Sequence, residues 1–569
     1  MPSIIHELDL KFRAAIQSAF GVEADPIVGP SQNEKFGDYQ SNAAMGLFKR
    51  VDLKNPRAVA EKIKEKLELG GMASEITIAG PGFINIRLNP AWLASRLQQF
   101  SKDERLGIPL APSRQTVVVD YSGPNIAKQM HVGHLRSTII GDAISRVIEF
   151  QGHQVIRQNH IGDWGTQFGM LIAHFPKGPS DAVSILDLEK FYREAKQRFD
   201  SDVAFQNESR SQVVSLQKGD PSSRTIWNRI VELTRQEYQP IYERLSVKLR
   251  KENERGESFY NPFLADVVKE LKAKGIASES EGAIVVFIDG PEKTPLIIQK
   301  SDGGYLYGTT DLAGIRYRIN ELHANRIIYT HDSRQAQHFR QVFDTAKKAS
   351  WTRGEEVRLD YAPFGTMLGE DGKPFKTRSG DTIKLIDLLD EAEKRALDVV
   401  KQKNPDLPQE QSSAIAKSVG IGAVKYADLS KDRISDYVFS WDKAMALDGN
   451  TAPYLQYAYA RIRSIFRKAE GGVASSANLK LENPFELALA KHILKLDELI
   501  ELVSRELKPH YLCTYLYELA TRFSGFYENC PVLKSEEPTR SSRLILCDLT
   551  ARTMALGLDL LGIEHPEQM

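Results

Sequence analysis

The feature that most constrains the fold is a strand, a glycine-bearing loop, a helix and a second strand in direct succession. Residues Thr116–Tyr121 (TVVVDY) have the apolar, β-branched composition of a buried strand. The apolar spacing predicts a helix over Val132–Gln151, ended by Gly152, and a second strand over Gln154–Asn159. A βαβ unit of this kind implies a parallel sheet that binds its ligands at the carboxyl ends of the strands.

The chain around this unit is too long for one core and predicts three or four domains. Single hydrophobic cores stop growing at roughly 250–300 residues, and this chain has 569. Further strands are expected at Ala283–Asp289, at Arg326–His331 and before Phe364, which would extend the parallel sheet. A charged, helix-prone stretch over residues 176–270 is interpreted as an insertion into this nucleotide-binding fold.

The two ends of the chain differ in pattern from the centre. Near the N-terminus a helix is expected over Ile4–Phe20 and a strand over Gly80–Leu88. A polar loop, Phe36–Asn42, lies between them, and a plain turn before a helix is its alternative explanation. Beyond about residue 405 helical periodicity dominates. Packed helices are predicted over Ala490–Glu506, Tyr511–Tyr527 and Ser541–Leu561.

These patterns together predict a multidomain α/β protein. At its centre we expect a Rossmann-like, doubly wound domain that binds a nucleotide. The expected bounds are 1–110 for an N-terminal α+β module, 111–404 for the central domain with its insertion, 405–445 for a helical connecting segment and 446–569 for an all-α C-terminal domain.

Composition restricts the class of protein and its partners. Lys plus Arg and Asp plus Glu number 75 each, so a polyanion would have to be bound by local patches. No run approaches the roughly 20 apolar residues of a membrane span, and the N-terminus lacks an apolar signal core, which indicates a cytoplasmic protein. Cys513, Cys530 and Cys547 are too far apart for a CxxC zinc site, so buried thiols and no protein-bound metal are expected.

The loop Pro124–His134 (PNIAKQMHVGH) carries the strongest functional signal. It leads from the first strand to the start of the helix, where unpaired backbone N–H groups and the helix dipole favour a phosphate. His131 and His134 are three residues apart, so their rings can face the same way, and Gly133 permits close approach of a flat ligand. Because imidazoles can donate to phosphate oxygens as charge develops, the loop is predicted to bind ATP.

Two histidines near a helix start have a plainer explanation, as packing or metal-binding residues. The HExxH pattern of zinc enzymes is missing, however, and HVGH follows a buried strand and opens a βαβ unit. This context favours the phosphate-binding interpretation.

In this setting HVGH resembles the HIGH motif of the class I aminoacyl-tRNA synthetases. The extended form PNIAKQMHVGHLRSTIIGD is similar to the arginyl-tRNA synthetases, most of all to their bacterial form. The resemblance covers nearly the whole chain. Further similar segments are NHIGDWGTQF at Asn159–Phe168, SDGGYLYGTTD at Ser301–Asp311, GNTAPYLQY at Gly449–Tyr457 and the terminal Met569.

The resemblance implies a second motif, KMSKS, in a mobile loop whose cations neutralise the phosphates of ATP. The candidate is KTRSG at 376–380, in which Lys376 and Arg378 supply the charge. Ser379 also belongs to the expected ATP site, but it stands where the motif has its second lysine. In many arginyl enzymes a lysine before the first motif is thought to compensate, and Lys128 has this position; the alternative is a solvated surface lysine.

An arginine site is implied as well. A guanidinium is planar and always charged, and carboxylates bind it best. Asp311 and Glu257 match the family's acidic positions, and Tyr307, four residues before Asp311, could cover the guanidinium or hydrogen-bond to it. Asn125 and Gln335 match amide positions near the substrate's amino and carboxyl groups. Taken singly, each of these could be an ordinary surface residue.

A tRNA-binding surface is expected in the C-terminal domain. Tyr454, Tyr457 and Tyr459 are followed by a basic run without acids, Arg461–Lys468, and aromatic rings interleaved with cations suit RNA bases and phosphates. A helix with an aromatic core face and a solvated basic face is the plainer alternative. The resemblance favours an anticodon-binding surface and implies a second contact between the N-terminal module and the tRNA elbow. The tRNA-binding candidates are Tyr39, Gln40, Tyr454, Tyr457 and Tyr527.

The activity implied by the resemblance is that of an arginine–tRNA ligase. Its substrates would be L-arginine, tRNA(Arg) and ATP, the last with Mg²⁺, and the enzyme would act as a monomer that forms the adenylate only with tRNA bound. One rival is a ligase of the same class for cysteine or glutamate, which the acidic Asp311 and Glu257 and the missing cysteine cluster disfavour. Another is a tRNA-binding relative without catalysis; intact His131 and His134 disfavour it, and the absent lysine keeps it open.

Overall fold

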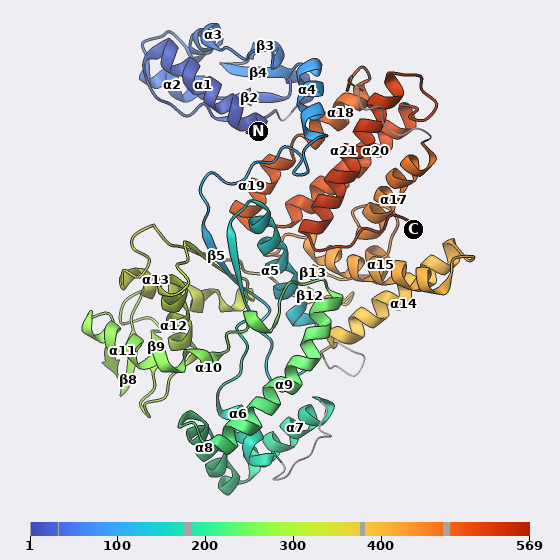
Figure 1. The fold of residues 1–569 in the computed structure, drawn as a ribbon. Helices are drawn as coiled ribbons and strands as arrows, with labels where there is room; N and C mark the ends of the chain where they lie inside the picture. The colour runs from blue at the N-terminus through green and yellow to red at the C-terminus, as the bar shows by residue number, and fades with distance from the viewer. Residues whose placement is uncertain (1, 32, 176–184, 376–381, 470–477) are drawn as a thin grey trace.

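The computed structural model describes residues 2–31, 33–175, 185–375, 382–469 and 478–569. It arranges them as an N-terminal module, a central α/β body with a helical extension, and a helical C-terminal module (Figure 1). None of the helices within these ranges is long and apolar enough to cross a membrane.

The central body contains the predicted parallel sheet. Its four strands lie in the order β11-β10-β5-β6, and every neighbouring pair is parallel. Non-consecutive neighbours require crossovers, as in other doubly wound sheets. The strands are β5 (Thr116–Asp120), β6 (Gln154–Gln158), β10 (Arg326–Tyr329) and β11 (Arg358–Tyr361). The first three begin at the predicted residue and end one or two residues before the predicted end, and β11 is the strand expected before Phe364.

Helices cover both faces of this sheet, which confirms the doubly wound architecture. Val117 and Val119 of β5 pack in the same core as α5 (Val132–Phe150), whereas Val118, between them, packs on the other side. That side is covered by α12 (Tyr307–Asn320) and α13 (Ala336–Lys348). Alternate residues of a strand point to opposite faces, so an uninterrupted apolar run such as VVV is what a strand between two helical layers needs.

The strand expected at Ala283–Asp289 exists but does not extend the parallel sheet. It is β8 (Ala283–Val286), and it lies between β7 (Ser278–Ser280) and β9 (Leu296–Gln299) in a separate antiparallel sheet. Short apolar strands have the same composition in both kinds of sheet, so the sequence could not assign this one.

The predicted insertion is largely helical. The helices α6 to α9 pack on one another and form the extension at the lower end of Figure 1. After α9 the chain returns to the sheet, because Asn159 and Glu254 pair in a parallel bridge. The helices are α6 (Thr166–His174), α7 (Ile185–Ser201), α8 (Val203–Gln217), α9 (Pro221–Arg244), α10 (Glu257–Tyr260) and α11 (Leu264–Ala273).

The N-terminal module is the predicted α+β unit. Its first helix, α1 (Ile4–Phe20), begins where the Ser3 side chain accepts a hydrogen bond from His6 N–H and ends at Gly21, whose φ is 67°. The sheet has the order β1-β2-β4-β3. Its other elements are β1 (Val28–Pro30), β2 (Tyr39–Ser41), α2 (Ala43–Leu47), α3 (Pro56–Lys66), β3 (Ala73–Ala79), β4 (Phe83–Leu88) and α4 (Pro90–Phe100).

The polar loop expected at Phe36–Asn42 is wrong in part, because Tyr39–Ser41 form β2 in the middle of this sheet. Polar residues can form a strand here because Tyr39 and Ser41 point inward, and the Ser41 hydroxyl donates to the Pro26 carbonyl at 2.6 Å.

The C-terminal part is helical, as predicted, and Cys513, Cys530 and Cys547 are all buried in it as free thiols. The helix expected over Ala490–Glu506 is interrupted: α18 ends at Ile493 and α19 begins at Leu496. The elements from the end of the sheet onward are β12 (Met367–Leu368), α14 (Leu385–Lys403), α15 (Gln409–Leu429), β13 (Tyr437–Val438), α16 (Trp441–Ala444), α17 (Ala452–Lys468), α18 (Pro484–Ile493), α19 (Leu496–Glu506), α20 (His510–Asn529) and α21 (Thr539–Leu560).

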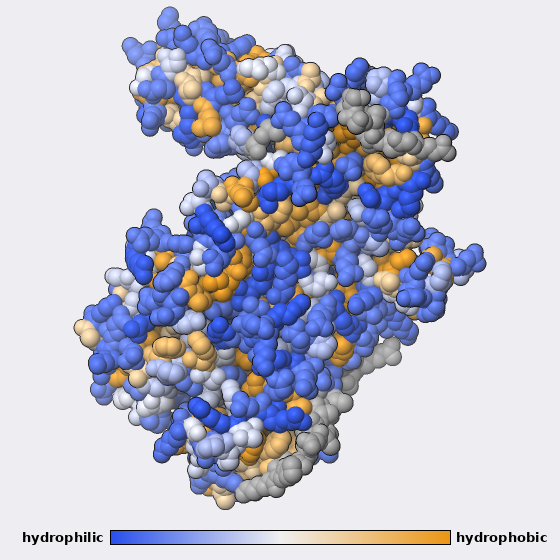
Figure 2. Space-filling view, in the orientation of Figure 1, coloured by the Kyte–Doolittle hydropathy of each residue, from blue (hydrophilic) through white to orange (hydrophobic). Residues whose placement is uncertain are grey.

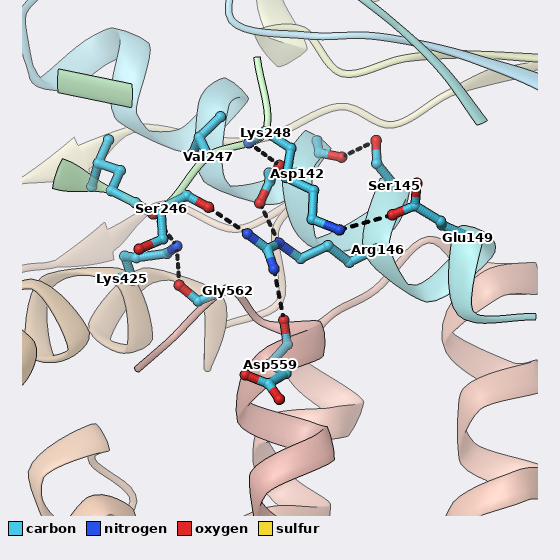
Figure 3. A network of polar contacts seen from close by, with 12 residues as sticks. Asp142, Ser145, Arg146, Glu149, Ser246, Val247, Lys248, Lys425, Asp559 and Gly562 are labelled. Atoms are coloured by element: carbon cyan, nitrogen blue, oxygen red, sulfur yellow. Dashed lines mark hydrogen bonds and ion pairs between the residues drawn. The ribbon is translucent and has the colours of Figure 1, made fainter. Parts of the chain in front are cut away.

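Arg146 of α5 and the buried Lys425 of α15 tie these helices to the chain that follows α9 and to the end of α21 (Figure 3). Arg146 of α5 donates to the Asp142 carboxylate at 2.6 Å and to two backbone carbonyls, and Lys425 of α15 donates to two more. Helix ends leave carbonyl groups without partners, and side-chain N–H donors such as these satisfy them. The carbonyls belong to Leu245 and Ser246 after α9 and to Asp559 and Gly562 at the end of α21.

Helix α19 connects the N-terminal module to the parallel sheet. Near its start, Glu498 accepts hydrogen bonds from the Tyr39 hydroxyl at 3.0 Å and from the Ile5 backbone at 3.1 Å. At its end, Arg326 donates to the Ser504 carbonyl at 3.1 Å. Figure 2 shows a mostly hydrophilic face, hollowed between the N-terminal module and the central body.

Candidate functional site

The loop 124–134 follows β5 and ends at the first turn of α5. His131 is the N-cap of this helix: its Nδ1 accepts from Gly133 N–H at 3.0 Å, and its own N–H donates to Nδ1 of His134 at 3.1 Å. The two rings lie side by side, with centroids 4.1 Å apart. Because each Nδ1 accepts a hydrogen bond, each neutral ring carries its proton on Nε2, where it can be donated to a ligand.

The environment keeps both imidazoles neutral. Burial lowers the pKa of His134 to about 3, and the charges of His131 and Lys128 act in the same direction. Burial and the Lys128 ammonium also lower the pKa of His131. At neutral pH the pair is therefore a fixed set of uncharged Nε2–H donors at a helix N-terminus, which is an arrangement suited to phosphate oxygens.

Gly133 is needed by the histidine pair itself. A Cβ atom at this position would lie 2.7 Å from Cε1 and 2.9 Å from Nδ1 of His131. The sequence suggested that Gly133 leaves room for a flat ligand; the structure adds that it leaves room for the His131 ring.

Lys128 lies in the same loop and is exposed to solvent. Its ammonium is 5.0 Å from the ring centroid of Tyr192, on α7. Ala127, just before it, has φ 62°, which turns the chain sharply at this point. The other predicted cations of the ATP site, Lys376 and Arg378, lie with Ser379 outside the described residues.

The structure brings the two predicted carboxylates together with a third. Glu257 is the first residue of α10, and Asp311 lies in the first turns of α12. Burial, together with the negative charges of Asp163 and Asp311, raises the pKa of Glu257 to about 7. A group of carboxylates that repel one another in this way is a site that a cation would stabilise.

Asp311 is hydrogen-bonded to His338 of α13, whose Nε2 lies 2.6 Å from the carboxylate. The ring of Tyr307 packs edge-on against His338, with centroids 4.7 Å apart, and Tyr307 is 63% exposed. Tyr307 and Asp311 share one face of a helix, as the sequence suggested. Tyr307 is therefore at the mouth of the carboxylate site.

The two predicted amides lie at the ends of other strands. Asn125 is exposed in the loop after β5 and pairs with Gly162 in a parallel bridge. Gln335 is exposed in the short 3₁₀ turn Ser333–Gln335 that precedes α13. Both stand in segments that follow strands of the parallel sheet at their carboxyl ends, the edge at which such sheets bind ligands.

Sequence reasoning missed Asp163 and His338 as members of this site. Asp163 stands in the segment NHIGDWGTQF, and His338 follows Gln335 by three residues, but the sequence pattern gives neither residue a role. The sequence offers no signal that distinguishes Asp163, because an aspartate beside a glycine is typical of an ordinary surface turn.

A buried ion pair supports the site from within the sheet. Arg318 of α12 donates to the Asp120 carboxylate at 2.6 Å and to the Gln158 side chain at 2.6 Å, and both acceptors end strands of the sheet. Arg318 and Asp120 are almost completely buried. The Arg318 guanidinium is one of the groups that hold the pKa of Asp120 well below its usual range, although burial opposes it.

The histidine-bearing helix is also tied to the segment that precedes the predicted second motif. Arg136 of α5 lies 2.9 Å from the Asp428 carboxylate and donates to the Ser435 carbonyl at 3.1 Å. Ser435 leads into β13, which pairs with β12, and β12 lies shortly before residues 376–380.

Part of the basic aromatic segment on α17 is exposed as expected. Tyr457 is 48% exposed, and Arg461, one turn later, lies with its guanidinium 4.7 Å from the Tyr527 ring centroid. Tyr454 is partly buried and packs near the Tyr517 ring. Together these residues present stacking faces and a positive charge on one surface.

Other residues of this segment are used inside the protein. Tyr459 is only 6% exposed and packs against His565. Arg463 pairs with the Glu567 carboxylate at 3.3 Å, and Arg467 donates to the Glu567 carbonyl at 3.0 Å. The period of the helix, rather than the run of cations, decides which side chains reach solvent.

Tyr39, expected at the tRNA elbow, is 2% exposed and donates its hydroxyl to Glu498 of α19. Its ring is therefore not available for stacking on a base in this arrangement, and its role here is to join two modules. Gln40, the next residue of β2, is partly exposed and keeps its place on the surface.

Comparisons with protein families divide the chain into three matched regions. Residues 6–88 match the arginyl tRNA synthetase N terminal domain, residues 96–441 match the catalytic domain of tRNA synthetases class I (R), and residues 455–569 match the DALR anticodon binding domain.

Individual relatives resemble the chain over its full length. The arginine–tRNA ligase of a Synechococcus species is 50% identical over 100% of both chains, and that of Hahella chejuensis is 51% identical over 99% of both. Among solved structures, arginyl-tRNA synthetase from Plasmodium falciparum superposes with a TM-score of 0.88 at 34% identity, and that from Thermus thermophilus with 0.83 at 26%. Each structure covers 100% of this chain and is itself covered completely.

Proposed function

The chain belongs to the arginyl-tRNA synthetases of class I, and we propose that it is an arginine–tRNA ligase, which uses ATP to join L-arginine to tRNA(Arg). The observation that carries this proposal is the pairing of two sites on one sheet edge. The first is the pair of neutral histidine donors at the N-terminus of α5. The second is the group of mutually repelling carboxylates around Glu257, which a bound cation would stabilise.

In the first step, the carboxylate of arginine attacks the α-phosphorus of ATP, a P–O bond forms, and pyrophosphate leaves with the electrons of the broken bond. Nothing in this step requires a protein nucleophile, so the enzyme contributes positioning and charge stabilisation. His131 and His134 donate Nε2–H to phosphate oxygens as negative charge grows on them. Lys128, exposed beside this pair, supplies a mobile positive charge from the same loop.

In the second step, a ribose hydroxyl of the terminal adenosine attacks the carbonyl carbon of the arginyl-adenylate. The hydroxyl loses its proton, an ester forms, and AMP leaves. The predicted tRNA contacts are Tyr454, Tyr457 and Tyr527 in the C-terminal domain and Gln40 in the N-terminal module.

Selection of arginine rests on Glu257 and Asp311. Their carboxylates would bind the guanidinium with charge-assisted hydrogen bonds, and Tyr307 would cover it from the mouth of the site. Asn125 and Gln335 would bind the amino and carboxyl end of the substrate. An acidic or neutral amino acid would leave these carboxylates uncompensated, and this excludes glutamate or cysteine as the preferred substrate.

The remaining features of the proposal rest on family membership. Mg²⁺ accompanies ATP as part of the substrate, adenylate formation needs bound tRNA, and the enzyme acts as a cytoplasmic monomer. The domain bounds are proposed as 1–110, 111–404 with an insertion at 176–270, 405–445 and 446–569; the matched families follow the same order along the chain.

Isotope exchange between pyrophosphate and ATP tests the proposal. The purified enzyme should catalyse arginine-dependent exchange in the presence of tRNA(Arg), with cysteine and glutamate inactive in place of arginine. Loss of exchange when tRNA is omitted would support the tRNA requirement. Binding of tRNA without arginine-dependent exchange would favour a non-catalytic tRNA-binding relative and refute the ligase assignment.

A further inference from the structure

We infer that Asp163 is a positioning residue for the arginine site: it holds the loop that carries Glu257, and it adds a negative charge that favours a cationic substrate. This inference rests on the proposed function, because it assumes that Glu257 faces the arginine guanidinium. It gives a role to a buried acid that the two reaction steps do not use.

Asp163 holds the residues next to Glu257 through both oxygens of its carboxylate. Asp163 lies in the loop after β6 and is 3% exposed. One carboxylate oxygen accepts from the Ser258 backbone N–H at 2.8 Å and the other from the Ser258 hydroxyl at 2.6 Å. Both bonds end on the residue directly after Glu257, so the carboxylate of Asp163 fixes the start of α10.

The backbone on the other side of Glu257 is fitted to the same carboxylate. A Cβ atom at Gly256 would lie 2.3 to 2.6 Å from the carboxylate atoms of Asp163, so only glycine allows this approach. The Glu257 N–H donates to the Ile161 carbonyl at 3.2 Å. Glu257 is therefore held by backbone contacts immediately before and after it.

The loop that supplies Asp163 is itself anchored. The Trp227 indole N–H, on α9, donates to the Asp163 carbonyl at 2.8 Å. Asp163 consequently joins three parts of the fold at one point: the end of β6, the start of α10 and the longest helix of the helical extension. Such an anchor limits the movement of Glu257 when the substrate enters.

Hydrogen bonding alone does not explain why this residue is charged. An asparagine could accept from the Ser258 N–H with its carbonyl and donate its amide to the Ser258 hydroxyl oxygen, without the cost of burying a charge. No Lys or Arg of the described residues forms an ion pair with Asp163. A buried carboxylate without a basic partner is explained if the missing cation is the substrate.

The charges around Glu257 agree with this explanation. Asp163 comes from the loop after β6 and Asp311 from α12, and both raise the pKa of Glu257. The titratable neighbours of these two acids include His160, whose pKa burial lowers, Tyr329, and His338, which is hydrogen-bonded to Asp311. The charges of Arg318 and Asp120 also act on His160, and these two form an ion pair with each other. The site therefore brings three acids together, whereas burial disfavours the charged form of His160, and a guanidinium would supply the missing positive charge.

Asp163→Asn tests the charge, and Ser258→Ala is the matched variant that keeps the charge and removes one of the two hydrogen bonds. The arginine KM is measured by exchange with saturating tRNA and ATP between about pH 6 and pH 8, where Glu257 titrates. In the unaltered enzyme this KM should rise as the pH falls, because Glu257 must be ionised to bind the guanidinium.

For Asp163→Asn, removing a negative neighbour lowers the pKa of Glu257, so the rise in KM should begin at a lower pH. At the upper end of the range the KM should be raised by about 10-fold, the effect of one pKa unit of lost interaction. The KM for ATP should not change. Ser258→Ala should raise the arginine KM, but the pH at which this KM begins to rise should stay where it is in the unaltered enzyme.

The competitor L-citrulline, the neutral isostere of arginine, gives a second measurement. The inhibition constant of L-citrulline divided by the arginine KM should be smaller for Asp163→Asn than for the unaltered enzyme. An unchanged arginine KM in Asp163→Asn, or an equal rise at every pH, would overturn the inference. If Asp163→Asn does not fold, a Ser258→Ala enzyme with an unaltered arginine KM would overturn the positioning role.

The outcomes also separate this inference from the proposed function. Absence of arginine-dependent exchange in the unaltered enzyme would refute the function. Normal exchange in the unaltered enzyme together with an unaffected Asp163→Asn variant would refute only the role of Asp163.

Discussion

The backbone N–H of His131 donates to Nδ1 of His134 at 3.1 Å, and this bond determines which nitrogen of His134 faces a ligand. In the same way, Nδ1 of His131 accepts a hydrogen bond from Gly133 N–H, which leaves Nε2 of His131 for a ligand. Each ring thus has one structural nitrogen and one that remains for chemistry. The two functions can be separated by substitution.

His131→Asn should separate them. Asparagine is a good N-cap, so the melting temperature should stay near that of the unaltered enzyme, whereas His131→Ala should lose about 1 kcal/mol of stability. Both variants lack the Nε2 donor, and exchange should fall by a factor of about 100 or more in each. Scanning calorimetry and exchange assays on the same samples test this; an active His131→Asn enzyme would show that the donor is dispensable.

Lys128→Ala should depress adenylate formation by a factor of about 100 or more, if Lys128 replaces the lysine missing at Ser379. Lys128→Arg should recover part of the loss, since it restores the charge. Lys190→Ala, an exposed lysine on the neighbouring α7, is the control and should be unaffected. Near-normal exchange in Lys128→Ala would show that Lys128 is an ordinary surface lysine without a role in adenylate formation.

Asp311→Asn should raise the KM for arginine far more than the KM for ATP. Loss of one charged partner of a desolvated ion pair costs about 2–5 kcal/mol, which corresponds to a rise of roughly 30-fold or more. Asp344→Asn, on the same side of the sheet but paired with Arg340, should change neither constant. Equal effects of Asp311→Asn on both substrates would indicate misfolding instead.

Tyr457→Ala should weaken tRNA binding without affecting the amino acid. Stacking of a base on an aromatic ring contributes about 1–3 kcal/mol, so the KM for tRNA should rise by roughly 10-fold. Phe485→Ala removes another exposed aromatic ring of the same domain and serves as the control. If both variants charge tRNA normally, the surface formed by Tyr457, Arg461 and Tyr527 does not contact tRNA.

Lys425→Met should change the pH dependence of stability. Burial lowers the pKa of Lys425 to about 7 in the folded protein, so between about pH 7 and pH 10 the unfolded chain binds more protons than the folded one. The contribution of Lys425 to stability must therefore increase as the pH rises through this window. The melting temperature of the unaltered enzyme minus that of Lys425→Met should therefore increase as the pH rises. A difference that does not change with pH would contradict the low pKa of Lys425.

The sequence was sufficient to predict the elements that depend on local pattern. The strand Thr116–Asp120 and the helix Val132–Phe150 follow from an apolar β-branched run and from helical spacing, and the helix α1 was placed to the residue. The position of the histidine pair at a helix start also follows from this order. Such properties depend on neighbours along the chain, and these neighbours are visible in the sequence.

Contacts between distant segments were decided only by the tertiary structure. Tyr39 was assigned to a tRNA contact, but it lies against Glu498, 459 residues away, and is buried there. The strand at Ala283–Val286 has a core composition and yet belongs to a separate sheet. Burial and sheet membership depend on which surfaces meet, and periodicity contains no information about that.

The loop 124–134 shows both contributions. By itself the sequence determined that two histidines and a glycine stand at the entrance of a helix that follows a buried strand. Only the tertiary structure decided that both imidazoles present Nε2–H. It also decided that Asp163 holds the start of α10 next to Glu257, through hydrogen bonds from Ser258, 95 residues away in the chain. The reason is physical: a protonation state and an electrostatic field depend on every group within a few ångströms, whatever its place in the sequence.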